Sequence, residues 1–143
     1  MKKLLLTAII AVSLISSSFA KGTSATVNYK VKSSFNYDFK EAQNVQWSST
    51  DAYVSASFVL DQKGAKAFYS HDGDLIGVSS AVTMDQLPAH AKRTFAKKYS
   101  GYTVTETIRF DKQEGSAYYI SAENENEKLV LQVENGQVTR YKN

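Results

Sequence analysis

The chain has 143 residues, with 17 lysines and arginines, 14 acidic residues and no cysteine. The lack of cysteine excludes disulfides, thiolate metal sites and a lipid anchor attached through cysteine. Without Lys2 and Lys3 the balance is 15 basic to 14 acidic side chains. Because this net charge is close to zero, the composition gives no electrostatic reason to expect binding to nucleic acid.

The first 20 residues have the features of a secretory signal peptide. Lys2 and Lys3 form its basic start, and residues 4–15 form an apolar stretch. Ser18 and Ala20 are small residues at the two positions that signal peptidase reads. The apolar stretch is shorter than the ~20 residues needed to cross a bilayer. We therefore expect cleavage after Ala20 and a periplasmic or secreted protein with no stable membrane span.

The next two segments are a polar leader and a short helix. Residues 21–32 are rich in serine, threonine and lysine, and are predicted to form a flexible leader or a short edge strand. Ser33 or Ser34 is the expected helix cap, because a serine oxygen accepts a hydrogen bond from a first-turn N–H. We expect Asn44 to end the helix. Its apolar stripe has helical spacing and consists of Phe35, Phe39 and Ala42.

Eight stretches alternate between apolar and polar residues and are predicted to be strands. They cover residues 45–48, 53–60, 65–70 and 75–83 in a first set, and 102–111, 116–123, 128–134 and 137–141 in a second. In the second set, we expect Val104, Ile108 and Phe110 to share one face. Asp72-Gly73 and Asn135-Gly136 are predicted hairpin turns, because glycine accepts the positive φ that such turns need.

A second helix separates the two sets of strands. Pro88 suits its first turn, where no N–H is needed, and Ser100-Gly101 ends it. Its apolar stripe is Leu87, Ala91, Phe95 and Tyr99, and its polar side carries His90, Lys92, Arg93, Lys97 and Lys98. We interpret this basic side as a solvated helix face.

These elements predict an α+β fold in one domain over residues 33–143. The short connections require antiparallel pairing, since a parallel return needs a crossover of a dozen residues or more. We expect tandem helix-plus-four-strand repeats over residues 33–83 and 87–142. Two helices then pack on one face of an antiparallel sheet, and the other face is open.

The order of these features resembles the PepSY-like family, also called β-lactamase-inhibitor-like, of small exported Bacteroidetes proteins. The phrases that carry the resemblance are Ala42 to Trp47, Tyr53 to Leu60, Asp72-Gly73, Leu87-Pro88 and Lys98-Tyr99. The resemblance implies helices on one face of a curved antiparallel sheet, and no catalytic residues. It also implies a binding role, because the inhibitor that names the family grips its enzyme with the concave sheet face.

We expect the open sheet face to engage a protein or peptide. If Val54 and Ile120 point into the core, the two-residue period directs Tyr53 and Tyr119 outward. Alignment of the two glycine hairpins places Phe68 inward and Tyr69 outward. The predicted contact set is Tyr53, Ser55, Ser57, Tyr69, Thr105, Thr107, Arg109, Tyr119 and Ser121. Such residues are common in interfaces, and they also suit half-buried strands that bind nothing.

Other interpretations remain open at this stage. A lipid- or glycan-binding envelope protein is the alternative, with an apolar cavity lined by Phe39, Phe58, Phe95 and Ile108. Trp47 is interpreted as a core residue beneath the first helix. We predict no enzyme activity and no cofactor. We also predict no metal site, because His71 and His90 lie in separate elements and the residues around Asp72 lack the spacing of a calcium loop. The expected state is a monomer or weak dimer.

Overall fold

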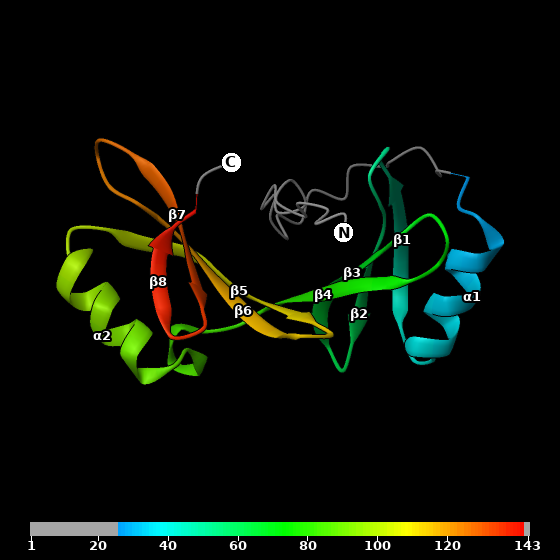
Figure 1. Ribbon diagram of the computed structural model, residues 1–143, viewed down its shortest axis with the longest axis horizontal. Coiled ribbons are helices and arrows are strands. Elements are labelled where there is room, and N and C mark those ends of the chain that lie inside the picture. The colour runs from blue at the N-terminus through cyan, green and yellow to red at the C-terminus, as the bar shows by residue number, and fades with distance from the viewer. Residues whose placement is uncertain (1–25, 142–143) are drawn as a thin grey trace.

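The structure, a computed structural model of the chain, describes residues 26–141. The predicted signal peptide, residues 1–20, and the first part of the predicted leader, residues 21–25, lie outside the described residues. Figure 1 shows one helix followed by four strands, and then a second helix followed by four more. The elements are α1 (Tyr29–Asp38), β1 (Gln43–Ser49), β2 (Val54–Leu60), β3 (Lys63–Tyr69), β4 (Leu75–Ala81), the 3₁₀ turn η2 (Met84–Gln86), α2 (Ala89–Lys98), β5 (Thr103–Lys112), β6 (Gly115–Glu123), β7 (Lys128–Glu134) and β8 (Gln137–Arg140).

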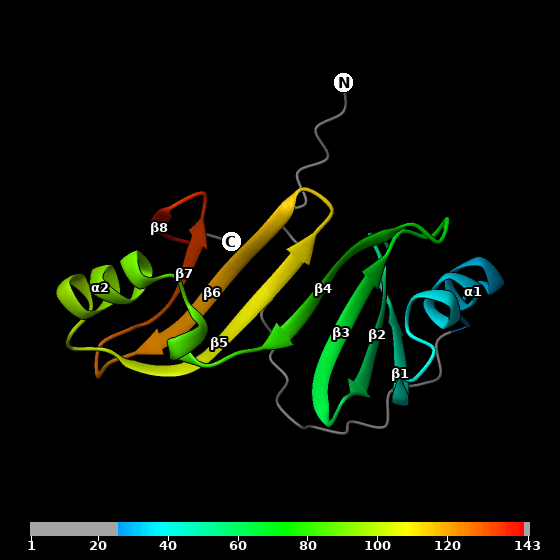
Figure 2. The same ribbon diagram turned by 90° about the horizontal axis from the view of Figure 1, so that it is seen from below.

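The eight strands form one antiparallel sheet in which the spatial order is the chain order, β1 to β8. Figure 2 shows the strands side by side, from β1 near one helix to β8 near the other. Most connections are short turns, so each strand pairs with its neighbour in sequence. Only the link from β4 to β5 carries a helix, α2. The predicted α+β class with an open antiparallel sheet is therefore confirmed, and the interpretation as tandem repeats stays a prediction.

Each helix packs on its own half of the sheet. The α1 side chains Val31 and Phe35 are buried against β2 and β3, and the α2 side chains Ala91 and Phe95 are buried against β6 and β7. The sheet contributes Val54, Ala56, Phe58, Ala67 and Tyr69 to the first core, and Ile120, Ala122, Leu129, Leu131 and Val133 to the second. The predicted apolar stripe of α2 is confirmed, because Leu87, Ala91 and Phe95 are all buried.

The two helices lie on the same face of the sheet. Val78 packs against the α1 core, and it pairs across the middle of the sheet with Asp111, which in turn pairs with Ser116. Tyr118, two residues further along β6, packs against the α2 core. Since side chains two apart share a face, one face of the sheet carries both helices (Figure 1).

Helix α1 begins earlier than the sequence analysis predicted. Asn28 is its cap, and its side-chain oxygen accepts a hydrogen bond from the N–H of Lys30 at 3.0 Å. Val27 and Val31 are buried in the α1 core, so residues 26–32 are part of the folded domain and not a flexible leader. Burial of Val27, Val31 and Phe35 at four-residue spacing favours helix here and outweighs the local polar composition.

Two β-bulges change which side chains share a face. One lies opposite the Phe68–Tyr69 step, between β3 and β4, and the other lies between Val104 and Glu106 in β5. A bulge adds one residue to one strand, and a shift of one residue sends the following side chains to the opposite face. Val104 therefore packs in the α2 core, whereas Ile108 and Phe110 lie on the other face. The prediction that these three share a face is wrong.

Candidate protein-binding face

The sheet face opposite the helices carries a third apolar cluster. Its buried members are Phe68 from β3, Ile108 and Phe110 from β5, and Ala117 and Tyr119 from β6. Partly buried side chains surround them: Tyr53, Ile76, Val130 and Tyr141. Figure 1 shows the sheet curving away from the helices, so this face lies on the inner side of the curve. We call this surface the concave face.

Aromatic rings connect the two halves of the concave face. The Tyr53 and Phe68 ring centroids are 5.5 Å apart, and those of Phe68 and Phe110 are 5.8 Å apart. Tyr119 meets Tyr141 edge to face with centroids 5.6 Å apart. Such tilted contacts are the favoured geometry for aromatic pairs. The row of rings therefore spans the boundary between the strands under α1 and those under α2.

Gly77 makes the close packing of Phe110 possible. A Cβ atom at this position would lie 2.6 Å from the ring atom Cζ of Phe110 and 2.8 Å from the carbonyl oxygen of Asp111. Real Cβ atoms do not approach other heavy atoms so closely, because van der Waals repulsion rises steeply at that range. The missing side chain lets the Phe110 ring lie directly over β4 and fill the centre of the concave face.

Five of the nine predicted contact residues lie on the concave face. Tyr53 directly precedes β2, Ser55 and Ser57 lie in β2, and Tyr119 and Ser121 lie in β6. Tyr53 is half-buried, Ser57 is exposed and Ser121 is partly exposed. Ser55 and Tyr119 are 1% and 4% exposed. The curved sheet packs them among their neighbours, so these two support the face from within and are not accessible contact residues.

Tyr69 lies on the opposite face, and its predicted outward orientation is wrong. It is fully buried beneath α1, where its hydroxyl donates to the Asp38 carboxylate at 3.0 Å. The sequence alignment treated both hairpins as two-residue turns, but five residues separate β3 from β4 whereas only Asn135 and Gly136 separate β7 from β8. That difference shifts the face by one residue. Phe68, predicted to point into the core, is the residue that lies on the concave face.

The other three predicted residues come from β5, at or after its bulge. Thr107 is buried and pairs with Ile120, on the face that the helices cover. Arg109 lies on that same face, where it is exposed and its Nε donates to Asp111 at 2.7 Å. Thr105 lies at the bulge, and its hydroxyl donates to the carbonyl oxygen of Ser121 at 3.2 Å. The predicted orientation of Thr107 and Arg109 is wrong, because the bulge interrupts the two-residue period.

Charged side chains border the apolar part of the concave face. Lys112 pairs with Glu134 at 2.8 Å, and Lys128 pairs with Glu123 at 3.1 Å. Burial raises the pKa of Tyr119, and the negative charges of the nearby Glu134 and Tyr141 raise it further, to about 12. This phenol therefore stays neutral at ordinary pH. Glu106 has one carboxyl oxygen that is buried without a hydrogen-bond partner among the described residues. Burial raises the pKa of this carboxyl.

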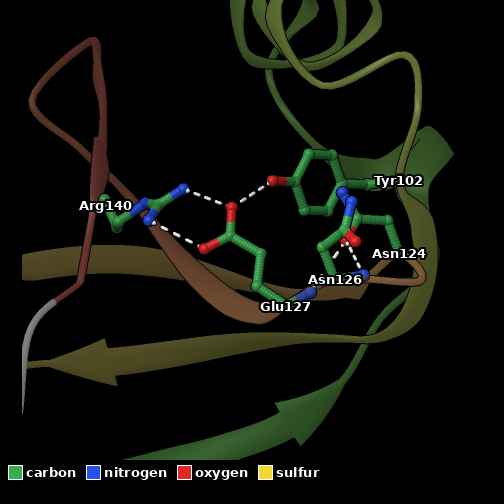
Figure 3. Close-up of polar contacts among 5 residues, drawn as sticks. All are labelled: Tyr102, Asn124, Asn126, Glu127 and Arg140. Carbon is green, nitrogen blue, oxygen red and sulfur yellow. Dashed lines mark hydrogen bonds and ion pairs between the residues drawn. The ribbon is translucent and has the colours of Figure 1, made fainter.

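A separate polar cluster lies away from the concave face (Figure 3). The Glu127 carboxylate accepts bonds from both terminal nitrogens of Arg140, at 3.0 and 3.1 Å, and from the Tyr102 hydroxyl. Hydrogen bonds from Tyr102 and Arg140 lower the pKa of Glu127 and hold it ionised. Asn124 caps the same turn through the backbone N–H groups of Asn126 and Glu127. Because both carboxylate oxygens are hydrogen-bonded, the cluster connects the β6–β7 turn to β8.

The four residues predicted to line a ligand cavity lie in different places. Phe39 and Phe58 pack on each other in the α1 core with centroids 4.7 Å apart. Phe95 belongs to the α2 core, and Ile108 lies on the concave face. They therefore do not surround one cavity. Trp47 packs against the α1 core with its ring edge-to-face on Phe35, as the sequence analysis predicted for a core residue.

Sequence reasoning missed Lys66, Phe68, Phe110 and Tyr141 as residues of the concave face. Phe68 was assigned to the core by aligning the two glycine hairpins, and Phe110 by its two-residue spacing from Ile108. The signal that could have found them is the small residue opposite each: Gly77 pairs with Phe68, and Ala117 pairs with Phe110. Small partners on neighbouring strands leave room for a large ring on the same face.

Two kinds of feature do not occur among the described residues. No helix in residues 26–141 combines the length and apolar character that crossing a membrane requires. Within the same residues no group of three histidine, aspartate or glutamate side chains is placed to hold a metal ion.

The fold is similar to that of several small Bacteroides proteins. A protein from Bacteroides eggerthii described as periplasmic superposes with a TM-score of 0.74 at 21% identity, covering 80% of this chain and 86% of its own. A DUF2874 family protein from Bacteroides uniformis gives 0.72 at 20% identity, covering 79% and 86%. A BLIP-like protein from Bacteroides fragilis gives 0.67 at 12% identity, covering 81% and 87%.

These similarities support a fold shared with BLIP-like and DUF2874 proteins. They do not confirm the PepSY-like part of the predicted resemblance. The sequence matches no family model and no curated protein at a significant level. Identities this low show the fold alone, and a fold hosts many functions. Function must therefore be argued from the concave face itself.

Proposed function

We propose that the mature protein is a non-enzymatic periplasmic interaction module that binds a protein or peptide through its concave face. The observation that carries this proposal is the row of aromatic rings on a sheet face that neither described helix covers. An apolar patch with a polar border on a small domain is typical of a protein-binding surface. Tyr53, Ile76, Val130 and Tyr141 are its accessible members, each partly exposed.

The proposal draws further support from the fold and from the polar residues. The similar structures include one protein described as periplasmic and one described as BLIP-like. The predicted signal peptide is consistent with that compartment. In the most connected polar cluster of the described residues, Arg140 and Tyr102 engage both oxygens of Glu127. A carboxylate held in this way is ionised and fully bonded, and is poorly suited to general acid–base catalysis.

A site-directed crosslinking experiment tests the proposal. The photoreactive residue benzoylphenylalanine is placed at position 53, on the concave face, or at position 37, and each protein is illuminated in envelope extract of the producing cells. Tyr37 is a matched control, because it is also a tyrosine and is 78% exposed on α1, on the helix-bearing side. We expect protein adducts from position 53 and few from position 37. Equal adducts from both positions, or none from position 53, would contradict the proposal.

A further inference from the structure

Lys66 stands on the concave face in an unusual setting. It lies in the middle of β3, directly opposite Ser57 on β2 and Ser79 on β4. Its ammonium group is 5.4 Å from the centroid of the Phe68 ring, which belongs to the concave cluster. The side chain is only partly exposed, and burial lowers the pKa of its ammonium group. A positive charge therefore sits over the aromatic row with part of its hydration removed.

Within the part of the chain that the structure describes, Lys66 differs from the other lysines of this face in having no carboxylate partner. Lys112 and Lys128 are paired with Glu134 and Glu123. No ion pair joins Lys66 to any acidic residue between positions 26 and 141. The Phe68 ring compensates for only part of the lost hydration, because the quadrupole of a ring attracts a cation less strongly than a full negative charge does. An added carboxylate would supply the interaction that the fold leaves out.

The surface beside Lys66 has room for such a group. Its neighbours across the strands are Ser57, which is exposed, and Ser79, which is buried. The Phe110 ring covers Gly77, the next position of β4 on the same face, so the open side of Lys66 is the β2 side, where Ser57 extends no further than a hydroxyl group. Tyr53 and Phe68 rise on the β2–β3 side of this shallow area, with ring centroids 5.5 Å apart. A side chain that reached Lys66 would therefore lie beside two aromatic rings.

We propose that Lys66 anchors the partner of the concave face by pairing with an aspartate or glutamate on a protruding loop of that partner protein. This inference rests on the proposed function and adds the chemistry of the partner: an acidic side chain next to apolar or aromatic residues. Charge complementarity of this kind sets specificity and register at a protein interface. The carboxylate would stack beside Phe68 and Tyr53 while its charge meets the ammonium group of Lys66.

The test uses a library of disulfide-constrained seven-residue loops displayed on phage, selected on the purified mature protein. We expect the enriched loops to contain aspartate or glutamate and to lose binding to the Tyr53→Ala variant. Lys66→Met, which removes the charge and keeps the apolar stem, should weaken a purified loop by about tenfold or more. Lys66→Arg should restore most of the affinity. Lys63→Met is the matched control, because Lys63 is exposed on the same strand and pairs with Leu60, on the helix-bearing face.

The outcomes separate this inference from the proposed function. Loops that require Tyr53 but carry no acidic excess, or that bind Lys66→Met like wild type, would overturn the inference and leave the concave face as a binding surface. Loops that bind Tyr53→Ala unchanged would count against the proposed face and against Lys66 together.

An oligogalacturonate is tested in parallel. If it binds in a Lys66-dependent manner and acidic loops do not, the partner is an anionic glycan and the protein-loop inference is wrong. Thermal unfolding of each variant verifies that it is folded.

Discussion

At the scale of single residues, the tyrosines show how position on a sheet decides chemical character. Tyr53, Tyr69 and Tyr119 occur in similar strand sequences, yet the first is half-exposed, the second is sealed beneath α1 and the third is packed within the concave face. Tyr69 is hydrogen-bonded to Asp38, and burial raises its pKa above the usual range. Only Tyr53 combines the orientation and the accessibility that the sequence analysis expected of all three.

The pKa of Tyr119 leads to a prediction for alkaline stability. Burial raises this pKa to about 12 from the ordinary value of 10.0. Between those values the unfolded chain has released the phenolic proton and the folded protein still holds it, so stability falls as pH rises. We expect Tyr119→Phe to reduce the loss in unfolding free energy between pH 10 and 12 by roughly 1–3 kcal/mol. Urea unfolding at several pH values measures it. Tyr118→Phe is the control, and an equal effect there would refute the assignment.

At the scale of elements, the two bulges determine the composition of the concave face. The bulge between β3 and β4 adds Ile76 to the concave face while Leu75 and Val78 remain on the helix-bearing face, and the bulge in β5 sends Ile108 and Phe110 to the concave face. The strict two-residue period that the sequence analysis expected would instead direct Thr107 and Arg109 to this face. These three apolar side chains lie there because the strand pairing departs from regular alternation.

Gly77 provides a direct test of this packing. Gly77→Ala places a Cβ atom against the Phe110 ring and the carbonyl oxygen of Asp111, so one of them must move. We expect the free energy of unfolding to fall by roughly 1–3 kcal/mol, the usual cost of overpacking. Chemical denaturation measures it. Gly101→Ala is the matched control, since no heavy atom lies within 4 Å of its added Cβ. Equal stability of the two variants would show that Phe110 does not lie over β4.

At the scale of the whole molecule, the sheet connects two helix-covered cores. β4 and β5 join the halves through four paired positions. The concave cluster spans the same boundary, because Phe68 of β3 contacts Phe110 of β5. A row of packed rings that crosses the junction couples the two cores energetically. The accessible aromatic residues therefore lie on a rigid platform, which reduces the entropy lost when a partner binds.

This coupling predicts a single cooperative unfolding transition. Trp47, the only tryptophan, reports on the α1 core, whereas far-UV circular dichroism reports on all elements. We expect the two signals to give the same urea midpoint in the wild-type protein, as a two-state domain of this size should. Phe68→Ala should lower that midpoint by removing the bridging ring. A tryptophan transition that precedes the dichroism change in the wild-type protein would show that the α1 half unfolds independently.

Local sequence patterns were sufficient to predict the strands, the second helix and the open antiparallel sheet. Periodicity and turn residues are local properties, and they place β2, β6 and β7 within about one residue of the observed bounds. The start of α1 was missed because its support comes from packing: Val27 and Val31 are buried only when the helix meets the sheet.

The face that most of the site residues occupy depends on how the strands pair in the folded protein. A bulge is a property of two paired strands, so no single strand sequence reveals it, and one extra residue reverses every orientation that follows. This is why Thr107 and Phe110 were assigned to the wrong faces. Tyr69 was misplaced for another reason: β2 and β3 pair regularly, but the alignment of the two hairpins ignored the longer β3–β4 turn. The setting of Lys66 depends on residues from three strands. That Lys66 has no carboxylate partner among residues 26–141 could be seen only once those strands were brought together.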